Sequence, residues 1–277
     1  MVFDLRDTLT IFGESPGLMR PVHAEDEPLV IPYVEIAVSM QCTLSCRDCC
    51  LMVPHYQEPA AMDAGAVLAA AEAFLEAVDR VIEFRVMGGE ALLQKELPQV
   101  LETLLSQPKI EHLELVSNAT LLPRPPLLEV LCHAKASIFF SNYGPRLCPH
   151  YRRIVDTCLD AGIMVRASGP ERTWVDYGPP VQHTTSLAEM QTIYSSCDMI
   201  CKHIWNGELH VCPRSAHGRA LGFIPVPPGD YVPLLTTPPD ERRRRIRELY
   251  ELDCITACGY CLYTNGTPVP AAIQTTT

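Results

Sequence analysis

The sequence contains no long apolar run and little positive charge, and each absence argues against a class of protein. No apolar stretch reaches the roughly 18 residues that a membrane-spanning helix needs, so we expect no membrane partner. Lys and Arg total 22 against 33 Asp and Glu, and the net charge of −11 is unsuited to the phosphates of nucleic acid. The first residues lack the basic start and apolar core of a secretion signal, which predicts a cytoplasmic location.

Cysteine, in contrast, is abundant, with 13 residues in the chain. Disulfides are rare in a reducing compartment, and this number of cysteines therefore indicates metal binding or catalysis. They are also unevenly spread: four lie within residues 42–50, three within 197–212 and three within 254–261. We therefore expect two separate cysteine sites.

Apolar and polar residues alternate in a way that predicts strands and helices in turn between residues 33 and 167. Five or more strands that alternate with helices predict an α/β fold with a parallel sheet and right-handed crossovers. These strands are too few for a complete eight-stranded barrel, so we predict a partial (β/α)6 barrel with its chemistry at the carboxyl ends of the strands. The predicted strands are 33–39, 81–87, 112–117, 136–141 and 163–167, and the predicted helices are 62–78, 98–106, 126–133 and 152–160.

The composition changes near residue 170, where prolines become frequent and the remaining cysteines gather. We divide the chain into an N-terminal extension (1–31), a partial barrel (32–184) and a small cysteine-held module (185–277). Within that module the pattern predicts one helix, over residues 239–250. Its run of arginines from Arg242 to Arg245 is interpreted as a solvated face.

The first cysteine group is Cys42-Thr-Leu-Ser-Cys46-Arg-Asp-Cys49, directly after the first predicted strand. Three thiolates on one short loop can bind three irons of a [4Fe–4S] cluster and leave the fourth iron open. A zinc loop is the alternative, because His55 or Cys50 could supply a fourth ligand.

Further motifs follow the next strands. Gly88 and Gly89 let the backbone approach a ligand closely, and Glu90 offers an acceptor for an ammonium group. Ser117 and Asn118 end the third predicted strand, and Ser141 ends the fourth. Together with the cysteine loop, these residues resemble the radical S-adenosylmethionine (SAM) superfamily.

The resemblance implies a [4Fe–4S] cluster on the three cysteines, with SAM bound beside it. It also implies that the Gly-Gly-Glu segment holds the SAM amino group, and that Ser117, Asn118 and, less directly, Ser141 contact its ribose and carboxylate. The sequence departs from the family at Asp48, where an aromatic residue usually packs near the adenine. The adenine contacts therefore stay open.

The second cysteine group has a spacing of its own: Cys197, nine residues, Gly207, four residues, Cys212, and much later Cys258-Gly-Tyr-Cys261. It resembles the twitch module, a short relative of the SPASM domain. The resemblance implies a second, auxiliary [4Fe–4S] cluster, with Cys201 as a rival to Cys197 for the first ligand position. A structural zinc ribbon is the alternative.

In this superfamily, cleaved SAM yields a 5′-deoxyadenosyl radical that removes hydrogen from a C–H bond. The segments Trp174-Val-Asp-Tyr-Gly178 and Cys212-Pro-Arg214 are similar to those of short twitch-containing enzymes of antibiotic and polysaccharide biosynthesis. A spare thiol, Cys254, beside the auxiliary cluster resembles the arrangement in the aminoglycoside epimerases that convert neomycin C to neomycin B. The resemblance implies inversion of an aminoglycoside carbon, with Cys254 returning hydrogen from the opposite face. A cationic aminoglycoside would also suit the acidic chain.

Three other functions stay open. A dehydrogenase of an amino-cyclitol or sugar alcohol would use a base and the auxiliary cluster as electron acceptor, and would leave Cys254 idle. Peptide modification is less favoured, because no separate peptide-recognition domain is evident. A mere iron–sulfur carrier would need none of the SAM motifs. Any of the enzymatic readings implies a reducing partner such as flavodoxin or ferredoxin.

Overall fold

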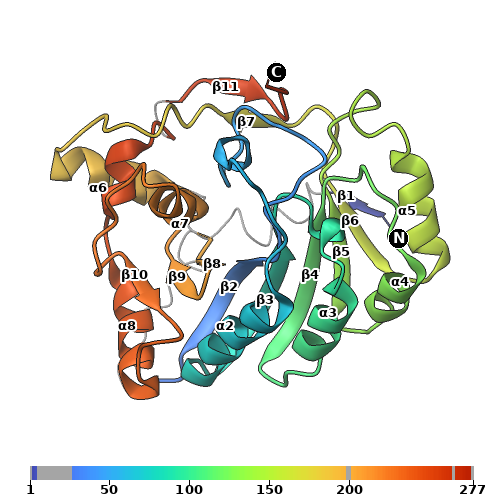
Figure 1. The fold of residues 1–277 in the computed structure, drawn as a ribbon, viewed down its shortest axis with the longest axis horizontal. Helices are drawn as coiled ribbons and strands as arrows, with labels where there is room; N and C mark the ends of the chain where they lie inside the picture. The colour runs from blue at the N-terminus through green and yellow to red at the C-terminus, as the bar shows by residue number, and fades with distance from the viewer. Residues whose placement is uncertain (1, 5–26, 198–200, 264–265, 276–277) are drawn as a thin grey trace.

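The computed structural model describes residues 2–4, 27–197, 201–263 and 266–275, which form a curved nine-stranded sheet with the order β1-β6-β5-β4-β3-β2-β8-β9-β10 (Figure 1). All neighbours from β1 to β8 pair in parallel, and β9 and β10 add antiparallel strands. The predicted α/β partial barrel is confirmed. The strands are β1 (Val2–Asp4), β2 (Val30–Ala37), β3 (Arg80–Met87), β4 (Ile110–Ser117), β5 (Ala136–Phe140), β6 (Met164–Ala167), β8 (His203–Trp205), β9 (Glu208–His210) and β10 (Tyr231–Pro233).

Four helices follow β2 to β5 in turn: α2 (Ala64–Ala77), α3 (Leu97–Leu105), α4 (Pro125–Leu131) and α5 (Tyr151–Asp160). The Asp63 side chain caps α2 by accepting a hydrogen bond from Ala66 N at 2.8 Å. Val67 and Phe74 of α2 share one buried core with Phe84 of β3. Every helix and strand predicted before residue 167 is confirmed within a few residues.

The sheet extends beyond the predicted barrel. Strand β8 pairs in parallel with β2, where Glu35 lies opposite His203. The sheet therefore runs across the predicted boundary at residue 184, and the division of the chain into domains stays a prediction. Most of the predicted N-terminal extension lies outside the described residues, apart from 2–4 and 27–31.

The prediction of a single helix in the cysteine-held module was incomplete. The predicted helix is α8 (Pro239–Glu251), but α6 (Leu187–Ser196) and α7 (Pro213–Ala220) are also helical. Strands β8 to β10 have three residues each, too short to show an alternating pattern.

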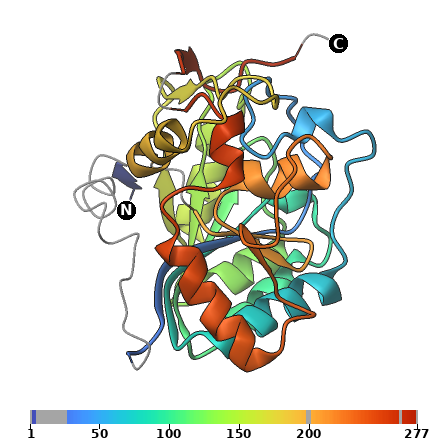
Figure 2. The same cartoon turned by 90° about the vertical axis from the view of Figure 1, so that its left-hand side faces the viewer.

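The arginine run of α8 is not simply a solvated face. Arg242 is 6% exposed and donates to Ala73 O, while Arg243 donates to Ala77 O. These carbonyls belong to the last turn of α2, where cationic side chains stabilise the negative end of the helix dipole. The arginines therefore join α8 to α2, which it contacts (Figure 2).

A second, two-stranded sheet pairs β7 (Thr173–Val175) with β11 (Pro268–Pro270) in antiparallel fashion. Figure 1 shows this pair at the top of the molecule, with the C-terminus beside it. The segment after β11 contacts the loop that follows β2. The end of the chain therefore lies close to the predicted site.

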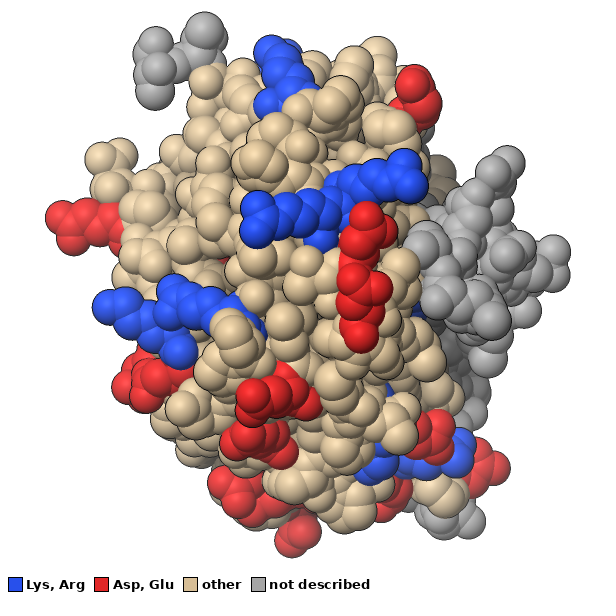
Figure 3. Space-filling view, turned by 90° about the vertical axis from the view of Figure 1, so that its right-hand side faces the viewer, with Lys and Arg blue, Asp and Glu red and all other residues tan. Residues whose placement is uncertain are grey.

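No helix in the described part of the chain is long and apolar enough to cross a bilayer. Figure 3 shows acidic and basic side chains spread over one face of the molecule, in places side by side. Among the described residues of that face, the basic side chains form no continuous track of the kind that follows a nucleic-acid backbone.

Candidate active site

A cavity of about 440 Å³ lies at the carboxyl ends of β2 to β5. Its volume falls in the usual range for small-molecule sites. The structure brings most of the predicted residues of the SAM site together in its lining, namely Cys42, Cys46, Cys49, Gly88, Gly89, Ser117, Asn118 and Ser141.

The three thiols of the cysteine loop are partly buried and influence one another. Burial raises the pKa of Cys42 to about 11 and that of Cys46 to about 12, and the neighbouring cysteines of the loop add to both shifts. Burial also raises the pKa of Cys49. Metal ligands must be deprotonated, so binding of iron here would release protons.

Hydrogen-bond donors point at the sulfurs of the loop, including backbone N–H groups directed at Cys49. Leu44 N donates to Cys42 Sγ at 3.4 Å, and Gln274 Nε2 donates to Cys46 Sγ at 3.3 Å. Asn118 Nδ2 lies 3.6 Å from Cys42 Sγ. Donors of this kind stabilise thiolate sulfur, so the loop fits an iron–sulfur cluster.

The alternative zinc site is not assembled around His55. The His55 ring is exposed and packs edge-on against Phe223, with 5.4 Å between ring centroids. Among the residues that the structure describes, no three His, Cys, Asp or Glu side chains are grouped as the ligands of a single metal ion.

Gly88 and Gly89 are required by the close approach of two backbones. A Cβ on Gly88 would lie 2.3 Å from Ser39 O, and a Cβ on Gly89 would lie 2.5 Å from Gln41 O. Gly89 N donates to Ser39 O at 2.7 Å. The two glycines therefore let the end of β3 pair with the segment that leads into the cysteine loop, and leave their backbone facing the cavity.

The Glu90 carboxylate is held by backbone N–H groups at the ends of two strands. It is 1% exposed and accepts hydrogen bonds from Leu92 N at 3.1 Å and Asn118 N at 2.7 Å. Burial raises its pKa, and these hydrogen bonds oppose the shift. These hydrogen bonds join the ends of β3 and β4, and Glu90 is not among the described residues that line the cavity. Its contact with the SAM amino group stays a prediction.

Asn118 holds the cysteine loop in place. Its Nδ2 donates to Thr43 Oγ1 at 3.0 Å, and its Oδ1 accepts from Thr120 Oγ1 at 2.6 Å. The buried Cys148 thiol, for which the sequence indicated no role, donates to Asn118 O at 3.2 Å. The end of β4 is therefore held by the cysteine loop through the Asn118 side chain and by Cys148 through the Asn118 carbonyl.

The aromatic surface of the cavity comes from residues outside the cysteine loop. Asp48 lines the cavity and forms an ion pair with Arg47 at 2.9 Å. Tyr143 and Trp174 meet edge to face, 5.5 Å apart, and Tyr177 lies nearby in the same lining. Trp174 and Tyr177 belong to the Trp-x-Asp-x-Gly segment, which was the sequence signal for them.

The floor of the cavity contains buried ion pairs that the sequence analysis missed. Arg85 binds Glu83 at 2.8 Å and Glu114 at 2.5 Å, and Arg166 binds Glu114 at 2.7 Å. These residues occupy inward-facing positions of β3, β4 and β6. Alternating polar residues in a strand usually indicate a solvated face, whereas here they fill the inside of the barrel.

A chain of hydrogen bonds leads from the cavity toward the surface. Tyr33 OH donates to Glu35 Oε2 at 2.8 Å, and Glu35 Oε1 is bonded to His203 Nδ1 at 2.8 Å. His203 Nε2 and His217 Nε2 lie 3.1 Å apart, and His217 Nδ1 is bonded to the half-buried Tyr56 OH at 2.8 Å. Glu35 and Tyr33 line the cavity, so a carboxylate in the site is connected to a residue at the surface.

The second cysteine group is partly assembled. Cys212 caps α7, and Cys258 and Cys261 lie in and after the 3₁₀ helix Thr256–Tyr260. Burial raises the pKa of Cys258 to about 12, and both other thiols add to the shift. Cys197 ends α6, whereas Cys201 lines the large cavity and its pKa is raised in part by Cys212. The choice between Cys197 and Cys201 stays open, since residues 198–200 lie outside the described residues.

Cys254, the predicted hydrogen donor, is not among the described residues that line the cavity. It is half-buried, and burial together with Asp253 raises its pKa. Cys50, named above as a possible zinc ligand, and Cys201, the rival ligand of the auxiliary cluster, do line the cavity. Thiols other than the predicted one, those of Cys50 and Cys201, therefore lie in the lining of the cavity.

Arg214 joins three segments around the second cysteine group. Its Nε donates to Tyr260 O at 2.9 Å, and its Nη2 donates to Gly178 O at 2.9 Å. Burial lowers its pKa, and the neighbouring thiols oppose the shift. The planar guanidinium thus anchors the loop between Cys258 and Cys261 to the Trp-x-Asp-x-Gly segment.

We expect Arg214→Lys to lower the free energy of unfolding by about 1.5–3 kcal/mol, because lysine cannot reproduce the forked hydrogen bonds. Urea denaturation of the metal-free chain measures the change. Arg244→Lys on α8 is the matched control, since its exposed pair with Glu248 contributes about 0.5 kcal/mol or less. Equal losses in the two variants would contradict the anchoring role.

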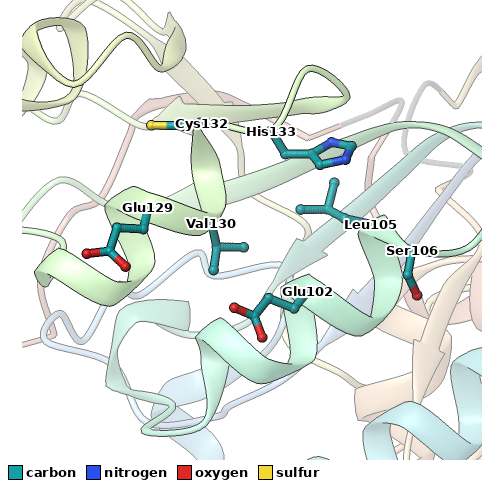
Figure 4. Close-up of a pocket in the computed structure, with 7 residues that line it drawn as sticks. All are labelled: Glu102, Leu105, Ser106, Glu129, Val130, Cys132 and His133. Atoms are coloured by element: carbon teal, nitrogen blue, oxygen red, sulfur yellow. The ribbon is translucent and has the colours of Figure 1, made fainter.

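A second hollow lies on the outside of the sheet, between α3 and the end of α4 (Figure 4). Its polar lining includes Glu102, Glu129 and His133. Cys132 is exposed, and its thiol donates to Leu128 O at 3.2 Å and to Ala161 O at 3.1 Å. This hollow is remote from the predicted motifs, and we assign it no function.

Comparison with known proteins finds no matching family model and no matching curated protein. Among solved structures, the chain is similar to Streptococcus suis SuiB bound to precursor peptide SuiA, with 20% identity over 50% of this chain and 32% of that one, and a TM-score of 0.40. It is also similar to anSMEcpe with bound AdoMet, with 16% identity over 48% of this chain and 43% of that one, and a TM-score of 0.38.

A third similar structure is BtrN in complex with AdoMet and 2-DOIA. Its identity is 14% over 86% of this chain and 94% of that one, with a TM-score of 0.48. The aligned region spans about a third of SuiB and under half of anSMEcpe. The functional assignment therefore depends on the residues of this chain's own cavity.

Proposed function

We propose that this protein is a radical SAM enzyme that oxidises an alcohol carbon of a small substrate. One observation carries the assignment to radical SAM chemistry. The three cysteines of one loop and the Gly-Gly and Ser-Asn segments of the next two strand ends all line one cavity at the carboxyl end of the sheet.

Under this proposal, Cys42, Cys46 and Cys49 hold a [4Fe–4S] cluster, and the backbone of Gly88 and Gly89 receives SAM. When bound, these cofactors supply a 5′-deoxyadenosyl radical that removes hydrogen from the substrate carbon, and an auxiliary cluster supplies the acceptor for the remaining electron. Cys212, Cys258 and Cys261 would hold that second cluster, with Cys197 or Cys201 as the fourth ligand.

The chain's own task in the oxidation is to take the hydroxyl proton next to the radical carbon. Glu35 suits this task, since its carboxylate lines the cavity and is hydrogen-bonded to His203. His217 and Tyr56 continue that hydrogen-bonded chain outward. A proton taken by Glu35 can therefore move away from the cavity through these side chains.

Epimerisation is the second candidate, favoured by the thiols of Cys50 and Cys201 in the cavity lining. A thiol there could return hydrogen to the opposite face of the carbon. Cys254, which the sequence resemblance assigned to this step, would have to reach the substrate from outside the described lining. We therefore place epimerisation, including the aminoglycoside reaction, after dehydrogenation.

The substrate class we propose is an amino sugar or amino-cyclitol alcohol, with flavodoxin or ferredoxin as the electron donor. Test compounds include neomycin C and 2-DOIA, the compound present in the BtrN complex. The assay uses the anaerobically reconstituted chain with SAM and reductant in D2O, and the product is analysed by mass spectrometry and NMR. We expect a product two mass units lighter with a new carbonyl. One deuterium at an inverted carbon would instead establish epimerisation.

Two variants separate the pathways further. Glu35→Gln keeps the shape of the side chain but removes the proton acceptor, so we expect oxidation to fall about a hundredfold or more while SAM cleavage continues. Cys254→Ala should leave oxidation unchanged and would abolish inversion only if that thiol were the donor. Wild-type oxidation in Glu35→Gln contradicts the role of Glu35. Absence of SAM cleavage by the reconstituted wild type contradicts the whole proposal.

A further inference from the structure

The C-terminal segment after β11 returns to the cysteine loop and binds it. An isolated antiparallel bridge joins Cys46 and Gln274. Backbone hydrogen bonds flank this bridge on both sides: Arg47 N donates to Ile273 O at 2.8 Å, and Thr275 N donates to Ser45 O at 2.7 Å. We call residues 271–275 the C-terminal strap.

The Gln274 side chain uses its whole amide in this contact. Its Nε2 donates to Cys46 Sγ at 3.3 Å and to Ala272 O at 2.8 Å. Its Oε1 accepts a hydrogen bond from Ser45 N at 2.9 Å. One side chain thus fixes both the backbone of the loop and the sulfur of its central cysteine.

The strap also connects the two cysteine groups along the chain. It follows Cys261 in the sequence, and β11 leads into it after pairing with β7. Strand β7 contains Trp174, which lines the cavity. Figure 1 shows β7 and β11 running side by side. The strap is therefore held at its start by the pairing of β11 with β7, and at its end by the hydrogen bond from Thr275 N to Ser45 O.

We propose that Gln274 is a positioning residue for the radical-generating cluster, and that its amide sets the reduction potential of that cluster through Cys46. This inference rests on the proposed function, since it needs a cluster on the three cysteines. An N–H···S hydrogen bond stabilises negative charge on the ligand sulfur, and that charge is greater in the reduced cluster. The bond therefore raises the reduction potential, and its loss makes the cluster harder to reduce.

The experiment compares Gln274→Leu and Gln274→Glu with the wild type in the anaerobically reconstituted full chain. Glutamate keeps the acceptor for Ser45 N but loses the donor to Cys46, whereas leucine loses both. The midpoint potential of the cluster is measured by redox titration followed by EPR. A Cys258→Ala chain, which lacks one proposed ligand of the auxiliary cluster, identifies the EPR signal of that second cluster. We expect the potential to become more negative in both variants, and cluster loss to be about 10-fold faster in Gln274→Leu.

Gln99→Leu is the matched control, because Gln99 is exposed on α3. Its potential should equal that of the wild type. Hydrogen exchange of Ser45 and Arg47 in the metal-free chain is a separate readout. We expect faster exchange in Gln274→Leu and slower exchange in Gln274→Glu than in Gln274→Leu.

The outcomes distinguish this inference from the proposed function. An unchanged potential in both Gln274 variants, with normal cluster uptake and SAM cleavage, overturns the inference alone. Faster hydrogen exchange together with an unchanged reduction potential would show that Gln274 has a purely structural role, and this result also overturns the inference. A wild-type chain that takes up no cluster on Cys42, Cys46 and Cys49 overturns the inference and the proposed function together.

Discussion

Gly88→Ala is expected to leave no measurable SAM cleavage and to lower the free energy of unfolding by about 3 kcal/mol or more. The added Cβ would lie 2.3 Å from Ser39 O and 3.0 Å from Ser39 N. Both atoms belong to the backbone, so no side-chain rotation can relieve the clash, and the cost reaches the upper part of the usual range for overpacking. The segment leading to Cys42 must then move away from β3.

Gly169→Ala is the matched control, because nothing lies within 4 Å of a Cβ at that position. We expect its stability to stay within about 0.5 kcal/mol of the wild type. Denaturation in urea gives the unfolding free energies, and iron content after reconstitution reports on the cysteine loop. Normal stability and iron content in Gly88→Ala would show that this backbone contact is not needed.

The second large effect is expected from Glu114→Gln, which should lower the free energy of unfolding by about 3–5 kcal/mol. Glu114 is fully buried and binds both Arg85 and Arg166. Removing its charge leaves two guanidinium groups inside the barrel, for which Glu83 is the remaining shared ion-pair partner among the residues that the structure describes. An unbalanced buried charge costs much more than an exposed one.

The same strand supplies the control for this substitution. Glu111→Gln removes an exposed pair with Arg80, for which we expect a loss of about 1 kcal/mol or less. Chemical denaturation at neutral pH compares the two variants. A similar small loss in both would mean that water enters the floor of the barrel and screens its charges.

The sequence predicted the barrel well because its strands and helices are long enough to show their periods. Helix α2 begins at its Asp63 cap, and each strand up to β6 lies within a few residues of its predicted place. The cysteine loop and the two glycines were predictable because their chemistry depends on local spacing. Their arrangement around one cavity followed from the rule that parallel strands end at the same edge of a sheet.

What the sequence could not show depends on contacts between distant residues. Glu35 and His203 are far apart in the chain, and only the pairing of β2 with β8 places them together. The Glu90 carboxylate suited an ammonium group by its chemistry, but the nearby N–H groups of Leu92 and Asn118 use its oxygens. The resemblance implies Cys254 as the hydrogen donor, but a resemblance in sequence does not determine which thiols line a cavity, and here Cys50 and Cys201 do.

The pairing of β2 with β8 also bears on how the chain folds. Strand β2 leads directly into the cysteine loop, and one of its edges stays unpaired until residues 203–205 have been made by the ribosome. The last backbone hydrogen bonds of the loop can form only after residues 273–275 have been synthesised, because these residues supply the partners. Contacts so distant in sequence form slowly, because a long loop must close before they stabilise anything. During synthesis, the cysteine loop therefore lacks these last backbone hydrogen bonds until residues 273–275 have emerged.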